Sequence, residues 1–315
     1  MQARIIKQAI LEGLPTASGM EIIDGMIYIV SKDATFLFCL DPYLQVKQKI
    51  KLLESTGQEV FQTQGKSDLG FGAITSIKIN GFNHLVIFGS GLLPSQNDKA
   101  FLVKLPTPYN RNFLVWERNM QEFYDFLSLN EEIVEPGSSL QIEGVAKGRD
   151  FLVLFNRKRK SAFNTALYFY LEEFIEFIQA HTEGFPFPLV LQEPLPLVEK
   201  KPVGFTGVTL FDEKLFFTIT AEVVSDTCEE EMVMKSYLGW GKVNSFDRLR
   251  GMEQIPMQQG LEALTQITKD EEIYKRAILA VSLFEKTEEE KYIALTLVND
   301  DAKGYLELLM LEVTL

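Results

Sequence analysis

The stretch "LQIEGVAKGRDFLVLFNR", residues 140–157, contains the pattern that decides the fold. Its first half runs in a set order of residue types: apolar, any residue, Gly or Ala, apolar, and then Ala, Thr or Ser. A polar turn follows and leads into five consecutive apolar residues, which end on Asn156 and Arg157. Two short apolar runs joined by a Gly-containing turn are typical of an antiparallel β-hairpin.

The same pattern recurs along the chain as an internal repeat. The copies are "FGAIT" (71–75), "FTGVT" (205–209), "ILAVS" (278–282) and the looser "ASGME" (17–21). Each copy is followed by a polar or Gly-containing turn and a second apolar run. The small residue and the polar end of the second run are 12 positions apart in two copies and 13 in a third, as hairpins of matched register require.

Four of the hairpins are followed by a third apolar run rich in residues that favour sheets. These runs are "KAFLVKL" (99–105), "NTALYFYL" (164–171), "EMVMKSYLGW" (231–240) and "GYLELLMLEVTL" (304–315). Units of three or four antiparallel strands that repeat about every 55 to 75 residues indicate the blades of a β-propeller. The small residue suits innermost strands, which crowd around a central axis.

We therefore expect an all-β, single-domain β-propeller over residues 1–315, with five blades preferred and six as the alternative. The N-terminal run "ARIIKQAIL" (3–11) has no hairpin partner of its own, and the last blade ends after its third strand. We expect this run to pair with the last blade and close the ring, which would remove open sheet edges.

Three segments are less regular. The segment "NMQEFYDFLSL" (119–129) has the spacing of a short amphipathic helix but could equally be an outer strand. The segment "LEALT" (261–265) also fits the repeat, yet Ala263 and Ala280 lie too close for both to begin separate blades. Either "LEALT" begins a blade with a long insertion or it is a helix or connector, which is slightly favoured. The Pro-rich segment 183–204 is interpreted as an extended connection between blades.

Composition and charge narrow the class of partner. The formal net charge of -13 argues against nucleic acid and anionic membranes, which need clustered basic residues. Cys39 and Cys228 are expected to be small buried hydrophobes rather than a disulfide framework or a zinc site. The N-terminus lacks the apolar core of a signal peptide, so we expect a cytoplasmic protein, or a periplasmic one if an export signal has been removed.

The candidate site follows from propeller geometry, because polar residues at one end of each inner hairpin converge on the axis. The expected ligand-binding residues are Asn156, Arg157, Thr206, Thr220 and Glu222, and the expected metal ligands are Glu143, Asn299, Asp300 and Asp68. Such oxygen-rich sets suit Ca2+, which takes six to eight oxygen ligands. The alternative is that each carboxylate caps a turn or pairs with Arg157 or Lys32.

Other chemistries find little support in the sequence. His84 and His181 are expected at the surface, and no nucleophile elbow, P-loop or dinucleotide motif is present. The run "RKRK" (157–160) either draws an anionic substrate toward the channel or is a solvated hairpin tip. The run "KTEEEK" (286–291) is expected to be an exposed hairpin tip.

Taken together, "IEGVA", "LVLFNR", "GFTGVTLFDEKLFFTITAE", a later "GW", "LVNDD" and "LELLMLEV" resemble an uncharacterised family of bacterial β-propellers. That family is distantly similar to esterase-like phytase domains and to calcium-dependent lactonase and strictosidine-synthase-like propellers. The resemblance implies that a common pocket is faced by Glu143, Asn156, Arg157, Thr206, Glu222, Asn299 and Asp300. Leu279 and Gly72 stand where the family pattern often has an acidic residue.

The sequence thus predicts a polar axial pocket that binds a small molecule, with a divalent cation such as Ca2+ as cofactor. The expected activity is hydrolysis of an ester, lactone or phosphoester, with Glu143 or Asp300 as the base. The alternative is a non-catalytic propeller that serves as a scaffold or sensor for a protein partner.

Overall fold

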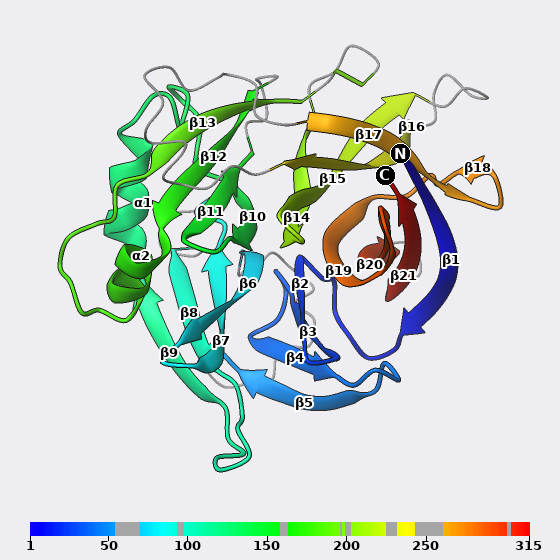
Figure 1. Ribbon diagram of the computed structural model, residues 1–315. Helices are drawn as coiled ribbons and strands as arrows, with labels where there is room; N and C mark the ends of the chain where they lie inside the picture. The colour runs from blue at the N-terminus through cyan, green and yellow to red at the C-terminus, as the bar shows by residue number, and fades with distance from the viewer. Residues whose placement is uncertain are drawn as a thin grey trace.

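The computed structural model describes residues 1–53, 70–92, 98–157, 163–195, 197–198, 203–224, 232–242, 261–300 and 304–315. Within these residues the strands form five antiparallel units of four strands each, arranged around a central axis (Figure 1). In four of the units the strands follow one another in chain order from the axis outward. The fifth takes its outermost strand from the N-terminus.

The units have the following bounds. The first contains β2 (Gly19–Ile23), β3 (Met26–Val30), β4 (Phe36–Leu40) and β5 (Val46–Lys51), and the second contains β6 (Phe71–Ile79), β7 (Phe82–Gly89), β8 (Lys99–Lys104) and β9 (Leu114–Asn119). The third contains β10 (Ile142–Lys147), β11 (Phe151–Asn156), β12 (Phe163–Tyr170) and β13 (Leu189–Pro194). The fourth contains β14 (Gly204–Phe211), β15 (Lys214–Val224), β16 (Met232–Lys242) and β17 (Leu261–Lys269), with β18 (Glu272–Ile273) paired to β17. The fifth contains β19 (Ile278–Glu288), β20 (Lys291–Asp300), β21 (Tyr305–Thr314) and β1 (Gln2–Leu11).

The innermost strands β2, β6, β10, β14 and β19 make a closed ring, since each contacts the next and β19 contacts β2 (Figure 1). The N-terminal strand β1 pairs antiparallel with β21 along its whole length, and it pairs parallel with β17 at Ala3 and Arg4. The prediction of an all-β propeller closed by its N-terminal strand is confirmed.

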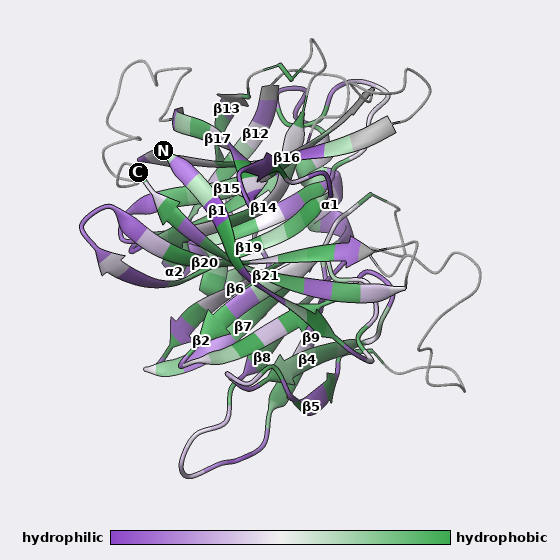
Figure 2. Cartoon of the chain, turned by 90° about the vertical axis from the view of Figure 1, so that its right-hand side faces the viewer, coloured by the Kyte–Doolittle hydropathy of each residue, from purple (hydrophilic) through white to green (hydrophobic). Residues whose placement is uncertain are grey.

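The hydrophobic core is divided among the boundaries between consecutive units, which we call seams. Among the described residues there are five buried apolar clusters, and each joins one unit to the next around the ring. A strand inside such a ring buries both of its faces, so its apolar residues form a continuous run rather than an alternating one. The run "FLVLF" (151–155) is buried throughout, and hydrophilic residues gather at turns and strand ends (Figure 2).

The repeated sequence pattern has a definite structural cause. In β6, β10, β14 and β19 the pairing register shifts after the first residue, so the "any residue" position of the repeat is the extra residue of a β-bulge. The small residue that follows packs against the next unit. A Cβ on Gly207 would lie 2.8 Å from Cα of Ala280, and one on Gly144 would lie 2.7 Å from Val208 Cγ2. Close approach across the seam therefore requires the small residue, more than crowding around the axis does.

The three less regular segments of the sequence adopt different structures. The segment 119–129 contains the helix α1 (Gln121–Ser128), whereas "LEALT" lies in strand β17, so the preference for a helix or connector was wrong. β17 is an outermost strand because its edge completes the fourth unit and pairs with β1. The Pro-rich segment supplies the outer strand β13, and the tip at 286–291 is exposed as expected.

A second helix, α2 (Leu171–Ile178), directly follows β12 and was not expected. Both helices pack at the periphery of the second and third units (Figure 1). In the described part of the chain, neither helix is long and apolar enough to cross a membrane. Cys39 is buried, as predicted, and Cys228 lies outside the described residues.

Candidate functional site

The expected site lies at one end of the ring, where the inner strands begin and the second strands end. We call this end the axial mouth. The bulge residues Glu143 and Thr206 lie here, together with Ser18, which directly precedes β2, and the polar ends of the second strands. Several of the described candidate residues therefore lie at this end of the fold, and their hydrogen bonds decide what each of them does.

Asn156 links three segments of the third unit by hydrogen bonds. Its Oδ1 accepts a hydrogen bond of 2.8 Å from the backbone N–H of Gln141. Its Nδ2 donates to the carbonyl oxygen of Ile133 at 2.8 Å and to Thr165 Oγ1 at 3.1 Å. The side chain is almost fully buried, and both of its N–H groups are used. Asn156 thus fixes the backbone around a pocket more than it offers donors to a ligand.

Thr220 and Asn299 bridge seams. Thr220 Oγ1 donates to the carbonyl of Ile278 at 3.3 Å, which links the fourth unit to the fifth. Asn299 Oδ1 accepts from the backbone N–H of Ala17 at 3.0 Å, which links the fifth unit to the first. Thr206 Oγ1 donates to Thr218 Oγ1 at 3.1 Å inside its own unit.

The other seams carry equivalent bonds. Ser18 Oγ donates to the carbonyl of Phe71, the Ile142 N–H donates to the carbonyl of Ser90 at 2.8 Å, and Asn164 Nδ2 donates to the carbonyl of Val203 at 3.0 Å. The bulges interrupt the ladder near the start of four of the five inner strands, β6, β10, β14 and β19, so backbone groups there need other partners. Polar residues at the axial mouth therefore serve first to join the units.

The expected ligand-binding residues and metal ligands are only partly described. Glu222 and Asp300 lie in β15 and β20, but their side chains are outside the described residues, as is the whole of Asp68. With Asn299 engaged by Ala17, the described part of the set offers one carboxylate, Glu143, which accepts a hydrogen bond from Gln141 Nε2. No group of three or more His, Cys, Asp or Glu that could hold a metal ion occurs among the described side chains. These residues alone do not make a calcium site.

Arg157 differs from the other candidates, because its guanidinium lines a pocket without an ionic partner. The pocket has a volume of about 220 Å³ and lies beside the axial mouth. Its wall includes Asn156, Gln141 and the loop residues Ser138 and Ser139. Among the described residues, no ion pair or side-chain hydrogen bond is made by Arg157, and none joins Lys32 to a carboxylate.

Glycine positions the Arg157 side chain. A Cβ on Gly204, the first residue of β14, would lie 2.4 Å from Cγ and 2.5 Å from Nε of Arg157. The arginine therefore crosses the seam from the third unit and lies flat on the backbone of the fourth. Its own backbone N–H donates to the carbonyl of Gln141 at 2.8 Å, which fixes the base of the side chain.

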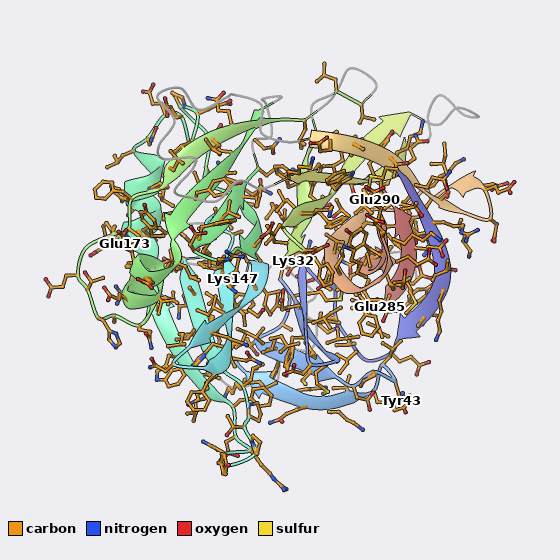
Figure 3. All side chains as sticks on the ribbon, viewed as in Figure 1. Lys32, Tyr43, Lys147, Glu173, Glu285 and Glu290 are labelled. Carbon is orange, nitrogen blue, oxygen red and sulfur yellow. The ribbon has the colours of Figure 1, made fainter. Side chains whose placement is uncertain are left out.

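A second polar cluster lies near the axis and was not predicted. Glu21 of β2 accepts a hydrogen bond of 2.9 Å from Ser76 Oγ of β6. Burial raises the pKa of Glu21 to about 7, against the lowering effects of the Ser76 hydrogen bond and of the Lys147 charge. Lys147, from β10, lies close to the centre of the ring (Figure 3). Three consecutive inner strands thus contribute to one charged cluster.

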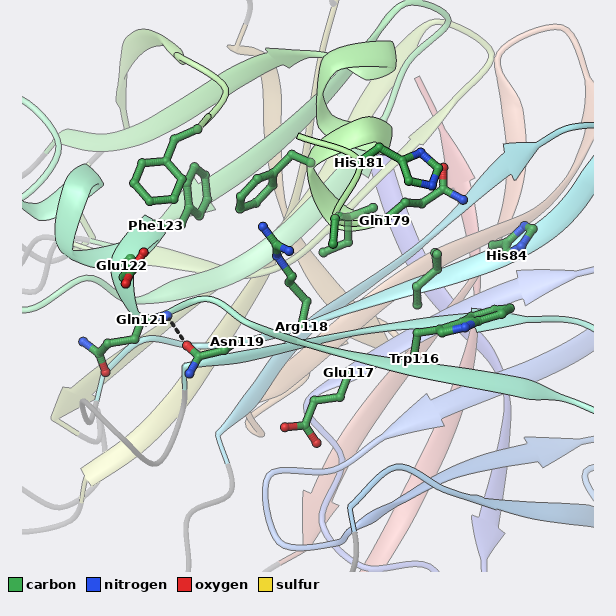
Figure 4. Close-up of a pocket in the computed structure, with 15 residues that line it drawn as sticks. His84, Trp116, Glu117, Arg118, Asn119, Gln121, Glu122, Phe123, Gln179 and His181 are labelled. Atoms are coloured by element: carbon green, nitrogen blue, oxygen red, sulfur yellow. Dashed lines mark hydrogen bonds between the residues drawn. The ribbon is translucent and has the colours of Figure 1, made fainter. Parts of the chain in front are cut away.

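A larger hollow lies at the periphery between the second and third units, with a volume of about 870 Å³. We call it the lateral groove. It is lined by His84, Leu102, Trp116, Glu117, Arg118, Asn119, Gln121, Glu122, Phe123, Phe177, Ile178, Gln179, Ala180, His181 and Phe185 (Figure 4). The prediction that His84 is a surface residue was wrong, since it is 5% exposed, whereas His181 is exposed as expected.

The sequence analysis missed this groove because its residues come from outer strands and from both helices, which carry no repeated motif. Two signals pointed to it. The chain has only two histidines, and both line the groove. Leu171, Phe174, Ile175 and Ile178 also have the spacing of a helix, which would have placed α2 beside β9.

Three solved structures that the chain resembles are distantly similar to it. An exo-1,5-alpha-L-arabinanase from a bovine ruminal metagenomic library is 9% identical, with 95% of this chain and 94% of that chain covered and a TM-score of 0.43. An alpha-L-arabinofuranosidase from Lactobacillus brevis is 9% identical, with 96% and 92% covered and a TM-score of 0.45. A glutaminyl cyclase from Myxococcus xanthus is 10% identical, with 99% and 97% covered and a TM-score of 0.41. Similarity at this level assigns no activity.

Sequence comparison is more specific. No curated protein matches the chain. The wider resemblance to phytase-like and lactonase-like propellers therefore stays a prediction. One family model, described as a family of unknown function (DUF6929), matches residues 13–313. Because this match spans nearly the whole propeller, the chain belongs to the DUF6929 family of unknown function.

Proposed function

We propose that the chain is a ligand-binding propeller that holds a small anion, a carboxylate or a phosphate, in the pocket beside the axial mouth. The observation that carries this proposal is the half-buried Arg157 guanidinium, which has no ionic partner among the described residues. A guanidinium removed from water without a counter-charge is costly. An oxyanion would supply that counter-charge through two parallel hydrogen bonds.

The surroundings of Arg157 support a small ligand. A pocket of about 220 Å³ has room for one compact group rather than a chain. The hydroxyl-bearing residues Ser138 and Ser139 line it and can donate hydrogen bonds to an anion. Glu135 also lines the pocket, but no ion pair joins it to Arg157, so the guanidinium is not neutralised from within the described wall.

The floor of the pocket is preorganised. Asn156 and Ile133 are each 1% exposed and are hydrogen-bonded to one another. Binding would therefore need little rearrangement of the backbone, which lowers the entropic cost of binding a small molecule. In this account the predicted residues Asn156 and Arg157 share one site, with Asn156 shaping the pocket and Arg157 binding the ligand.

Thermal unfolding with added anions tests the proposal. We expect inorganic phosphate or succinate to raise the unfolding midpoint, because a ligand bound only by the folded state stabilises it by about 2.7 kcal/mol at a hundredfold excess over Kd. The Arg157→Gln variant should lose this rise. The matched control is Arg111→Gln, an exposed arginine in another loop, with chloride at equal ionic strength as the reference. A rise of equal size in the wild type and Arg157→Gln would contradict the proposal.

Cation-dependent hydrolysis of a bound ester, lactone or phosphoester is a second proposal. It is favoured by the oxygen-bearing residues Ser18, Glu143 and Thr206, which lie at the axial mouth beside the anion pocket. Hard cations prefer such oxygen ligands. The described side chains supply too few oxygen ligands for a complete site. Binding of Ca2+ would therefore also need the expected ligands Asp68 and Asp300, whose side chains are not among the described ones.

Calcium titration separates the two proposals. If the cation binds, Ca2+ should raise the unfolding midpoint, a chelator should reverse the rise, and Glu143→Gln should weaken the response by about tenfold in Ca2+ concentration. The exposed Glu131→Gln is the control. The absence of any shift with Ca2+ in the wild type would remove the hydrolase proposal and leave anion binding untouched.

A further inference from the structure

The lateral groove is separate from the Arg157 pocket, and the two share no lining residue. It lies between the outer part of the second unit and helix α2 of the third (Figure 4). Its volume of about 870 Å³ falls in the range of roughly 300–1,000 Å³ that is usual for small-molecule sites. It is larger than three other pockets of the described residues, which have volumes of about 220, 250 and 470 Å³.

The floor of the groove is rigid and apolar. Leu102, Phe123 and Phe177 are each at most 3% exposed and belong to the core of the seam between the second and third units. The rings of Phe123 and Phe177 lie 4.9 Å apart, and Phe185 packs edge-on against Phe177 at 6.0 Å. A ligand would therefore meet a preformed surface.

Trp116 provides an open aromatic surface at the side of the groove. Its side chain comes from the outermost strand β9, and the residue is 47% exposed. The His84 ring packs 6.4 Å from the indole. Burial and the nearby Lys104 charge lower the pKa of His84, so this neighbour is an uncharged ring at neutral pH. An indole held in this way offers one apolar face to a ligand.

Planar polar groups surround the aromatic surface. Arg118 lies with its Cζ atom 4.9 Å from the centre of the Phe177 ring, which holds the guanidinium at the groove while leaving its N–H edge available for hydrogen bonds. Gln179 and His181 lie together at the end of α2, opposite Trp116 (Figure 4). Glu122 adds a carboxylate from α1. The groove therefore combines donors and acceptors with an apolar surface.

The direction of the side chains favours a small molecule over an extended peptide. Trp116 and Arg118 point from β9 toward α2, whereas Glu117 between them points away (Figure 4). The groove thus lies over the face of β9 and not along its open edge. A peptide that added a strand to the sheet would use the backbone of that edge instead.

From these observations we infer that the lateral groove binds a short saccharide, stacked on Trp116 and hydrogen-bonded by Arg118, Gln179 and His181. A pyranose ring has an apolar C–H face and a rim of hydroxyl groups. The C–H face matches the exposed indole, and the hydroxyl rim matches the amide, imidazole and guanidinium groups. We choose a saccharide because the groove has both an apolar aromatic face and polar groups, as a sugar ring requires.

Tryptophan fluorescence tests the inference directly. The chain has two tryptophans, so the Trp240→Phe variant reports on Trp116 alone. The probes are cellobiose, maltose, xylobiose, chitobiose and their trisaccharide homologues at millimolar concentration. We expect at least one probe to change the Trp116 emission in a saturable way. Calorimetry with that probe should show about tenfold or greater weakening in Trp116→Ala.

Two controls separate a loss of binding at Trp116 from general effects of removing an aromatic residue or of unfolding. Tyr43→Ala removes another highly exposed aromatic residue, 84% exposed at the periphery of the first unit, and should leave binding unchanged. Trp116→Ala should unfold at nearly the wild-type temperature because the side chain is half-exposed. The inference is overturned if no probe changes the emission, if binding persists in Trp116→Ala, or if only extended peptides produce the change.

Discussion

Replacing Glu21 by glutamine is expected to stabilise the protein, and to do so more strongly as the pH rises. The half-buried carboxyl lies between the first and second units, and its removal from water raises its pKa from 4.5 to about 7. The folded state thus holds a proton that the unfolded state releases near pH 4.5. As the pH rises from that value to the folded pKa, the wild type loses stability, and above it the full penalty of about 3 kcal/mol remains.

Glutamine removes the penalty because it carries no charge, and it keeps an oxygen that can accept the Ser76 hydrogen bond. The stability difference between Glu21→Gln and the wild type should grow by about 2 kcal/mol between about pH 5.5 and about pH 8. Urea unfolding at the two pH values measures it. Loss of the favourable interaction with Lys147 would reduce the gain but not its dependence on pH.

The control for this experiment is Glu12→Gln, an exposed carboxylate just after β1. Its effect should stay within about 0.5 kcal/mol at both pH values. A stability difference for Glu21→Gln that does not change with pH would show that Glu21 is not buried among the inner strands as described.

Substitution of Gly72 by alanine is expected to be among the most destabilising single changes in the ring. Gly72 is the bulge residue of β6, and a Cβ there would lie 2.3 Å from the carbonyl oxygen of Ile142. Backbone cannot move aside as a flexible side chain can, so the seam between the second and third units must open. Overpacking of this kind costs about 1–3 kcal/mol or more.

Two other glycine-to-alanine variants allow the loss of stability in Gly72→Ala to be compared. Gly144→Ala should be milder, because the added methyl group meets the side chain of Val208, which can rotate. Gly184→Ala should be nearly neutral, since its nearest neighbour is 3.7 Å away at Thr182 Oγ1. Chemical unfolding of the three variants gives the ranking. Equal stability of Gly72→Ala and Gly184→Ala would contradict the close packing of the inner strands.

The inner hairpins could be predicted from sequence because one local geometry is imposed at successive seams. The bulge determines which position of the repeat can hold any residue. The close approach of the next unit determines which position must hold a small residue, as Gly144 and Gly207 show. Both constraints act within a few residues, so both leave a visible pattern. Strand β17 was misassigned because its pairing with β1 depends on residues far away in the chain.

The sequence named polar candidate residues, but it did not predict the structural hydrogen bonds that the described ones make. Polar residues at the ends of the second strands do gather at the axial mouth, yet Thr220 and Asn299 bond backbone groups of the next unit. Sequence shows that a residue is polar, but not whether a bulge has left an unpaired backbone group beside it. The sequence did not distinguish Arg157 from the other candidates. The structure does, because Arg157 lines a pocket and pairs with no carboxylate among the described residues.

The central claim is that Arg157 binds a small anion at the axial mouth, and isothermal titration calorimetry tests it most directly. Wild-type protein and Arg157→Gln would each be titrated with the anion that most raises the unfolding midpoint, at low ionic strength. The account predicts saturable binding with one site per chain in the wild type, weakened by about tenfold or more in the variant. Undiminished binding to Arg157→Gln, or the absence of binding to the wild type, would contradict it.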